Sequence, residues 1–239
     1  MYLSDEEINR FRGTGEVNAA GDDLETFLAA YNPDKYKKAS NTVDTLVFTY
    51  NETQENGKTV RNIGKVLLIK RGNHPSIGWW ALPGGFVDFR ESLDVAALRE
   101  LREETGIEDI EVCQLRCYGN YDRDPRTHLI TTAYVALVPE GSVKAQAGDD
   151  ACDSGWFTLN DMIASGVCKD GIKTDVHKLM LHNESAGIWI GADVEVTTRV
   201  GRILPQKNYK VIGSNKVAAD HGAIILEGYH YVKELLKHH

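Results

Sequence analysis

Apolar residues along the chain follow two different periods, and the period of two that is typical of strands dominates the middle of the sequence. Apolar runs over residues 42–50 and 64–71 predict two strands. The polar stretch between them carries the hairpin signal Asn56-Gly57 and predicts a turn. Further strands are predicted over residues 111–118, 129–138, 188–200 and 207–213, the last two as partners.

Helical spacing of apolar residues appears at both ends of the chain and once in its centre. Residues 1–40 are polar and are predicted to form two helical pieces, the second capped by Asp22 or Asp23. A central helix is predicted over residues 92–105, and a closing helix over residues 218–237.

The order of these elements predicts an α/β protein made of four segments. We expect a helical arm first, then a core, then a β-rich insertion, and finally a helix that closes the core. The predicted boundaries are 1–40, 41–160, 161–212 and 213–239. His238 and His239 resemble the end of an expression tag and receive no role.

Composition and charge narrow the class of protein. The chain has 239 residues, 42% of them hydrophobic, and a net charge of −8, which disfavours nucleic acid as the main partner. No apolar run approaches the ~20 residues of a membrane span, and the N-terminus lacks the features of a secretory signal. The four scattered cysteines suit free thiols. We therefore expect a cytoplasmic protein without a membrane partner.

The central helix concentrates acidic residues beside its apolar stripe. At ~100° per residue, Glu100, Glu103 and Glu104 fall within an arc of about 100°. Three carboxylates this close repel one another, and one arginine, Arg99, does not balance them. Hard divalent cations take carboxylate oxygens and link them to phosphate oxygens. The pattern therefore indicates a cation site for a phosphorylated ligand, although an exposed, charged helix face is the ordinary alternative.

The spacing of residues 85–107 decides between these interpretations. Glycine, glutamate, the Arg-Glu-Leu triplet, the Glu-Glu pair and Gly-Ile occur at the positions of the Nudix box. At average residue usage, a chance match in this length has a probability on the order of 10⁻⁷. The chain therefore resembles the Nudix hydrolases. The stretches KRGNHP (70–75), WALPGGFV (80–87) and DRDPR (122–126) resemble the ADP-ribose pyrophosphatase-like branch.

The resemblance implies a fold and a chemistry. The fold would be an α/β/α sandwich around a mixed sheet. The activity would be hydrolysis of the diphosphate of ADP-ribose to AMP and ribose 5-phosphate, or of a related nucleoside diphosphate derivative, with Mg²⁺ or Mn²⁺ as cofactor. The resemblance also implies a homodimer. The amphipathic pattern of the helical arm predicts that it packs on the body of the protein or reaches across to the partner subunit.

The resemblance also implies roles for individual residues. Metal ligands would be the Gly84 carbonyl, Glu100, Glu103 and Glu104, while Arg99 and Glu91 would pair and hold the loops that flank the helix. Gly85 and Gly106 would be structural, with Ser92 and Gly106 at the two helix ends. Predicted substrate contacts are Arg71, Arg123, Arg126 and Trp79. The acid that orients the attacking water would be Glu100 or one of three acids on a later loop, Asp149, Asp150 and Asp153.

Two other functions compete with hydrolysis. Relatives of this branch include regulators that sense ADP-ribose and bind DNA through a winged helix. The residues after Phe157 predict strands and one helix instead of a helix-turn-helix. An interaction module with a vestigial box is the third hypothesis, and the complete set of box acids disfavours it.

Overall fold

The computed structural model describes the chain except residues 1–3, 56, 145–150, 202, 204–205 and 238–239. It divides into two compact units, Met1–Lys38 and Ala39–His239. No helix of the described residues is long and apolar enough to cross a membrane.

The first unit contains the two helical pieces predicted for the arm. They are α1 (Asp5–Asn9) and α2 (Leu24–Ala30). Ser4 caps α1, and the Asp23 side chain accepts a hydrogen bond from the Thr26 N–H at the start of α2. Phe27 and Tyr31 leave about half or more of their surface exposed. The capping residue therefore defines α2 more than packing does.

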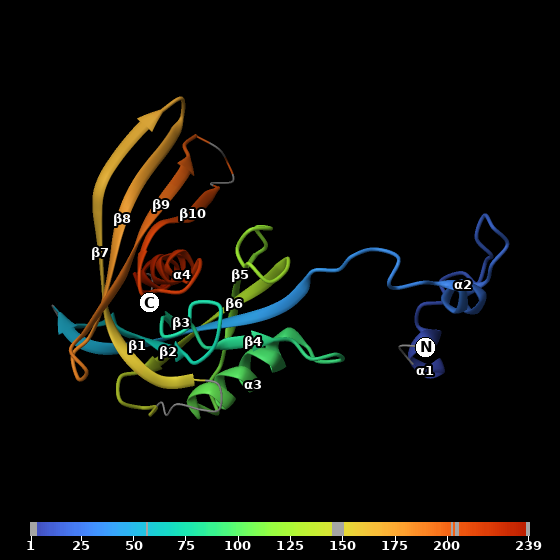
Figure 1. The fold of residues 1–239 in the computed structure, drawn as a ribbon, viewed down its shortest axis with the longest axis horizontal. Coiled ribbons are helices and arrows are strands. Elements are labelled where there is room, and N and C mark those ends of the chain that lie inside the picture. The colour runs from blue at the N-terminus through green and yellow to red at the C-terminus, as the bar shows by residue number, and fades with distance from the viewer. Residues whose placement is uncertain (1–3, 56, 145–150, 202, 204–205, 238–239) are drawn as a thin grey trace. The chain divides into compact units, whose positions relative to one another are not determined.

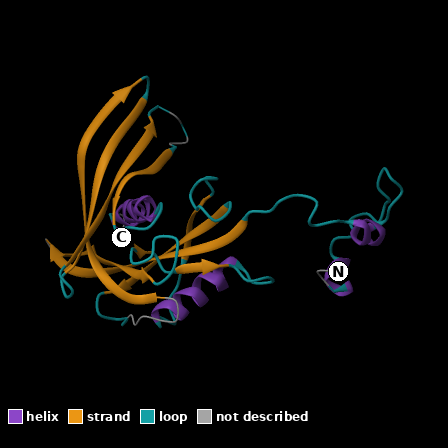
Figure 2. Ribbon diagram, viewed as in Figure 1, coloured by secondary structure: helices purple, strands orange, loops and turns teal. Residues whose placement is uncertain are grey.

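The second unit is built on one ten-stranded sheet with two helices (Figures 1 and 2). The main order is β10-β9-β8-β7-β2-β1-β6-β5, with β3 paired to β2 and β4 paired to β1. Only β1 and β6 pair in parallel among the described strands, so the sheet is mixed. The strands are β1 (Ser40–Glu55), β2 (Lys58–Arg71), β3 (Trp80–Ala81), β4 (Gly84–Phe86), β5 (Cys113–Tyr118), β6 (Leu129–Pro139), β7 (Ala151–Lys169), β8 (Ile172–Asn183), β9 (Ile188–Arg199) and β10 (Lys207–Asn215). The helices are α3 (Leu93–Thr105) and α4 (His221–Leu236).

The β1–β2 hairpin is longer than its apolar pattern predicts. Residues 51–62, expected as a turn, continue the two strands until Glu55 pairs with Lys58. Gly57 turns the chain with a φ of 77°, a conformation that glycine adopts without steric cost. The extension is an exposed ribbon of polar residues, so hydrophobic pattern alone did not reveal it.

The two faces of the central strands pack on different helices. On one face, Val47 of β1 and Leu67 of β2 lie in a buried cluster with Leu101 of α3. On the other face, the neighbouring residues Leu46 and Leu68 lie in a cluster with residues of α4. This alternation follows the period of two of a strand buried on both sides. The predicted arrangement of a helix, a sheet and a helix is therefore confirmed.

The β-rich segment predicted over residues 161–212 is present, but it continues the core sheet. Strand β7 runs through the predicted boundary at residue 160 and pairs with β2. A two-residue turn joins β7 to β8, with Asp170 and Gly171 both at positive φ. Strands β7 to β10 then curve around α4 (Figure 1). The segment therefore lengthens the core sheet.

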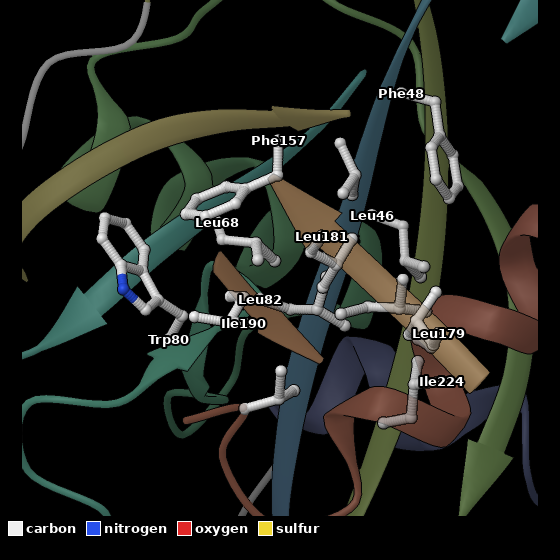
Figure 3. Packing of buried hydrophobic residues seen from close by; sticks show 14 of the residues in the cluster. Leu46, Phe48, Leu68, Trp80, Leu82, Phe157, Leu179, Leu181, Ile190 and Ile224 are labelled. Carbon is white, nitrogen blue, oxygen red and sulfur yellow. The ribbon is translucent and has the colours of Figure 1, made fainter. Parts of the chain in front are cut away.

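The curved segment shares its core with the central strands (Figure 3). Leu179 and Leu181 of β8 and Ile190 of β9 lie in the same buried cluster as Leu46 and Ile224. The Trp80 and Phe157 rings also pack edge to face, with ring centroids 4.8 Å apart. Helix α4 is therefore packed between two parts of one sheet.

Replacement of Leu181 by alanine tests whether this core is shared. Leu181 is fully buried, so the cavity should lower the free energy of unfolding by about 2–5 kcal/mol. Because one core joins both parts, the whole second unit should unfold in one shifted transition. Urea unfolding followed by tryptophan fluorescence and by circular dichroism measures both effects. The control is Val167→Ala, since Val167 lies on the same curved segment and is 61% exposed. Two transitions, with only one shifted by Leu181→Ala, would show that the segment folds independently.

Candidate active site

A cleft of about 360 Å³ lies where β1, β4 and α3 meet the N-terminus of α4. Two loops close its sides, the residues after β2 and the residues before β6. Acidic side chains line one wall and arginines line the loops. The residues used below are Asp44, Arg71, Gly84, Gly85, Glu100, Glu104, Arg123, Arg126 and His221, all of which line it.

Glu104 reaches the cleft from the last turn of α3 and is bound by β4. The Gly84 N–H donates a hydrogen bond of 2.8 Å to Glu104 Oε2. A Cβ atom on Gly84 would lie 2.0 Å from the carbonyl oxygen of Val43, so only glycine allows this approach to β1. The glycine contact therefore fixes where the end of α3 sits against the sheet.

Glu100 lies one helical turn earlier and faces the next glycine. A Cβ atom on Gly85 would lie 2.5 Å from Glu100 Oε2, so any side chain here would displace the carboxylate. The opposite oxygen, Glu100 Oε1, accepts a hydrogen bond of 2.7 Å from Arg99. The two adjacent glycines thus make room for two carboxylates that enter the cleft side by side.

Arg99 joins the helix to the loop before it. Its Nε and Nη2 atoms donate to the two oxygens of Glu91, at 2.8 and 2.9 Å. Nη2 also donates to the carbonyl oxygen of Phe86, and Nη1 donates to Glu100 and to Glu103. The predicted ion pair between Arg99 and Glu91 is present. It joins α3, which carries the acidic side chains, to the loop before it. Glu103, a predicted metal ligand, is 45% exposed beside Arg99 and is not among the described residues that line the cleft.

Asp44 is an acid in this region that the sequence did not single out. It lies on β1 with 7% of its surface exposed, and its Oδ2 accepts a hydrogen bond of 2.7 Å from Thr131. Arg123 Nη2 lies 3.8 Å from the same oxygen. An aspartate within the strand predicted over residues 42–50 was the available signal, because burial of a charge requires partners.

His221 is the second residue that the sequence analysis did not assign to the site. It begins α4, and its Nδ1 accepts a hydrogen bond of 2.9 Å from the Leu82 N–H. The neutral ring therefore carries its proton on Nε2, which lies 3.9 Å from Asp44 Oδ1. The neighbouring Asp220 binds Arg123 instead, so the two adjacent residues act on different partners.

Burial and like charge disfavour ionisation of the two cleft glutamates. For Glu104, burial raises the pKa to about 8, opposed by the Gly84 N–H and reinforced by the charges of Glu100 and Asp44. For Glu100, burial again raises the pKa, and the contacts with Arg99 only partly offset it. A cation placed between these oxygens would favour the ionised form of both groups.

The donor chemistry of this wall fits a hard divalent cation. Such ions take several oxygen ligands, and Mg²⁺ typically uses one or two carboxylates together with phosphate oxygens and water. Glu100 and Glu104 supply carboxylates from consecutive helical turns, and Gly84 lines the wall beside them. The donors present therefore suit Mg²⁺ or Mn²⁺.

Three of the four predicted substrate residues line the cleft. Arg123 binds both oxygens of Asp220, at 2.8 and 2.9 Å, and Arg126 binds Asp124 in the same two-pronged way. Arg71 donates to the carbonyl oxygen of Pro75. Trp79 is 38% exposed and is not among the described residues that line the cleft.

Of the three acids predicted on the later loop, only Asp153 lies among the described residues. Asp149 and Asp150 lie outside the described residues. Asp153 is exposed on β7, where it pairs with Lys70, and it does not belong to the described lining of the cleft.

Comparison with known proteins agrees with this geometry. Residues 42–174 match the family model described as NUDIX domain. An ADP-ribose pyrophosphatase from Methanocaldococcus jannaschii is 45% identical over 98 residues, which are 41% of this chain and 57% of that protein. The ADPR responsive transcriptional repressor NtrR from Acinetobacter baylyi is 35% identical over 141 residues, 58% of this chain and 52% of the repressor. The chain thus spans about half the length of the curated relatives it matches.

A solved structure resembles nearly the whole chain. The crystal structure of a MutT/nudix family protein from Enterococcus faecalis superposes with a TM-score of 0.61 at 29% identity, covering 98% of this chain and 76% of that one. The family match itself spans more than half of the chain and includes Gly84, Arg99, Glu100 and Glu104. The chain therefore belongs to the Nudix family.

Proposed function

We propose that this protein is a divalent-cation-dependent Nudix pyrophosphatase. Its substrate is ADP-ribose, hydrolysed to AMP and ribose 5-phosphate, or a related nucleoside diphosphate derivative. The observation that carries the proposal is the pair of carboxylates, Glu100 and Glu104, seated against Gly84 and Gly85 in a cleft that arginines close on the other side.

The names of two relatives support the choice of substrate. One is an ADP-ribose pyrophosphatase, and the other is a repressor that responds to ADPR. Both names refer to the same small molecule, so a pocket for it suits either activity. The acidic wall of this chain supports hydrolysis in particular, because binding an anion alone does not require clustered carboxylates.

The reaction requires water to add to one phosphorus while the bond between that phosphorus and the bridging oxygen breaks, so that the bridging oxygen leaves with the other phosphate. When bound, a divalent cation would offset the charge of the diphosphate and lower the pKa of its bound water. Glu100, Glu104 and the Gly84 carbonyl would hold that cation, with Glu103 available at the edge. Arg99 and Glu91 would keep the acids in position, which leaves catalysis to preorganised charge.

The arginines of the loops would bind the anionic diphosphate of the substrate. A guanidinium has five donors, of which Arg123 uses two on Asp220 in a fixed orientation. The Pro75 carbonyl oxygen orients Arg71, and the Asp124 carboxylate orients Arg126. Each side chain would therefore lose little conformational entropy when it binds the substrate. Trp79 stays a predicted substrate contact, and it is not among the described residues that line the cleft.

Of the two described acids predicted to orient the attacking water, Glu100 is better placed than Asp153. It lines the cleft, and Arg99 fixes one of its oxygens. Asp153 is exposed on β7 instead. A cytoplasmic location and a homodimer that involves residues 1–40 stay predictions of the sequence.

An ADP-ribose-sensing regulator is the second candidate, and the NtrR relative is the observation that favours it. The described residues after β6 form strands and the single helix α4, which is not the two-helix unit that reads a DNA major groove. The net charge of −8 also opposes a large phosphate-binding surface. We therefore place hydrolysis first.

A substrate panel with Mg²⁺ tests the proposed activity. It would compare ADP-ribose with NADH, diadenosine polyphosphates, sugar nucleotides and nucleoside triphosphates, with phosphatase-coupled release of phosphate as the measurement. We expect the highest kcat/KM for ADP-ribose. Glu104→Gln should lower kcat by about 10²-fold or more, because a lost cation ligand removes several kcal/mol of transition-state stabilisation.

Glu108→Gln is the matched control for this panel, since Glu108 is an exposed glutamate just beyond α3. It should leave kcat unchanged. Preference for another substrate would retain the chemistry and reject ADP-ribose. Absence of hydrolysis across the panel, combined with binding of ADP-ribose, would reject the enzyme in favour of the regulator.

The raised pKa of Glu104 predicts how metal-free protein responds to pH. The folded pKa of about 8 lies above the ordinary value of 4.5, so the folded state holds an extra proton between them. Stability should therefore fall as pH rises through this interval, by a few kcal/mol in all. Urea unfolding of chelator-treated protein at several pH values would show this slope, and Glu104→Gln should flatten it.

Added Mg²⁺ should restore stability mainly at the alkaline end, because the cation binds the ionised carboxylates. Equal slopes for wild type and Glu104→Gln would show that Glu104 does not carry a perturbed pKa. An equal effect of Mg²⁺ on both proteins would place the cation elsewhere.

A further inference from the structure

A second group of potential metal ligands lies outside the cleft. Asp161 of β7, His177 of β8 and His230 of α4 bring one ligand atom each to within 4.8 Å of the others. Within the described part of the chain, no other group of three or more histidine, cysteine or acidic residues meets that spacing. His230 follows His221 by nine residues, which is about 13 Å along α4. The group is therefore distinct from the acidic wall of the cleft.

The three side chains are held by direct contacts. Asp161 Oδ1 lies 2.7 Å from His177 Nδ1, and Asp161 Oδ2 lies 2.9 Å from His230 Nε2. The remaining nitrogen of His230, Nδ1, lies 3.1 Å from the hydroxyl of Tyr209 on β10. Each histidine thus turns one nitrogen toward the same carboxylate.

The cluster is partly shielded from solvent, and its contacts favour the ionised form of Asp161. The side chains of His177, Asp161 and His230 are 8%, 12% and 23% exposed, so His230 provides the most open approach from solvent. Burial raises the pKa of Asp161, but hydrogen bonds from His230 and His177 outweigh it and hold the pKa below its usual value. Asp161 is therefore an anion at neutral pH.

We propose that Asp161, His177 and His230 bind a divalent transition-metal ion, with Zn²⁺ the best match. Two imidazoles and a carboxylate form a mixed nitrogen and oxygen set that suits Zn²⁺, which accepts three protein ligands and a water. Zinc distances of about 2.0–2.2 Å place ligand atoms about 3.4 Å apart, so adjustments of about an ångström would complete the site. Tyr209 occupies the position of an outer-shell partner that orients a ligand histidine.

The alternative is a hydrogen-bonded latch between α4 and the curved strands, without a metal. Two conservative substitutions separate these possibilities. His177→Asn keeps a donor near the position of Nδ1, and His230→Gln keeps one near Nε2, so both preserve a hydrogen bond to Asp161. Neither amide replaces an imidazole as a zinc ligand.

The experiment uses the full chain after treatment with a chelator, with His238→Ala and His239→Ala in every protein to remove the terminal histidines. Calorimetric titration with Zn²⁺ measures affinity, and the visible spectrum of bound Co²⁺ reports a four-coordinate site. We expect one site per chain at the cluster. His177→Asn and His230→Gln should each weaken Zn²⁺ binding by more than the ~100-fold that loss of an outer-shell partner can cause, and Tyr209→Phe should weaken it by about 10–100-fold.

Glu104→Gln serves as the control for the cleft and should leave Zn²⁺ binding and the Co²⁺ spectrum at this site unchanged. Retention of wild-type affinity and spectrum in His177→Asn and His230→Gln would overturn the proposal. Absence of Zn²⁺ binding to the wild-type chain would do the same, and would identify the cluster as a hydrogen-bonded latch. Loss of the site in Glu104→Gln alone would assign the ion to the cleft.

Discussion

The close approach of two glycines to β1 and α3 is the constraint on which the site depends. No side chain fits at Gly84, because the Val43 carbonyl occupies that space, and none fits at Gly85 without moving Glu100. The backbone N–H of Gly84 then meets Glu104 inside a protein interior where an unpartnered carboxylate is costly. The acids are therefore positioned by backbone packing, and Arg99 braces them from the opposite side.

The site brings together charged side chains whose burial or mutual repulsion is unfavourable. Glu104 is buried with the partly buried Glu100 beside it, and Asp44 adds a third acid from β1. Arginines face them across the cleft, yet Arg123 is committed to Asp220 and Arg126 to Asp124. The excess negative charge on the acidic wall favours binding of a cation. The oriented arginines favour binding of an anion. A diphosphate carried with a divalent ion satisfies both.

Helix α4 connects the cleft to the rest of the second unit. Its first residue, His221, accepts a hydrogen bond from Leu82 at the cleft, and its middle is packed between the central strands and the curved β7–β10 segment. Tyr209, His230, Asp161 and His177 form a polar contact between α4 and three of those strands. The curved segment therefore supports the helix that supports one side of the site.

The local pattern of the sequence determined much of the fold and the identity of the box residues. Spacing along one helix was enough to group Glu100, Glu103 and Glu104 and to pair Arg99 with Glu91, because neighbours on a helix are set by its period. Caps and glycines likewise predicted where α3 begins and ends, at Ser92 and Gly106. Only the tertiary structure showed that residues 161–212 extend the core sheet, since strand pairing between distant segments leaves no local periodic signal. It also brought Asp44 and His221 to the cleft from opposite ends of the chain, left Trp79 outside the described lining, and joined His177 to His230. Those contacts depend on burial between elements far apart in sequence, which no local spacing encodes.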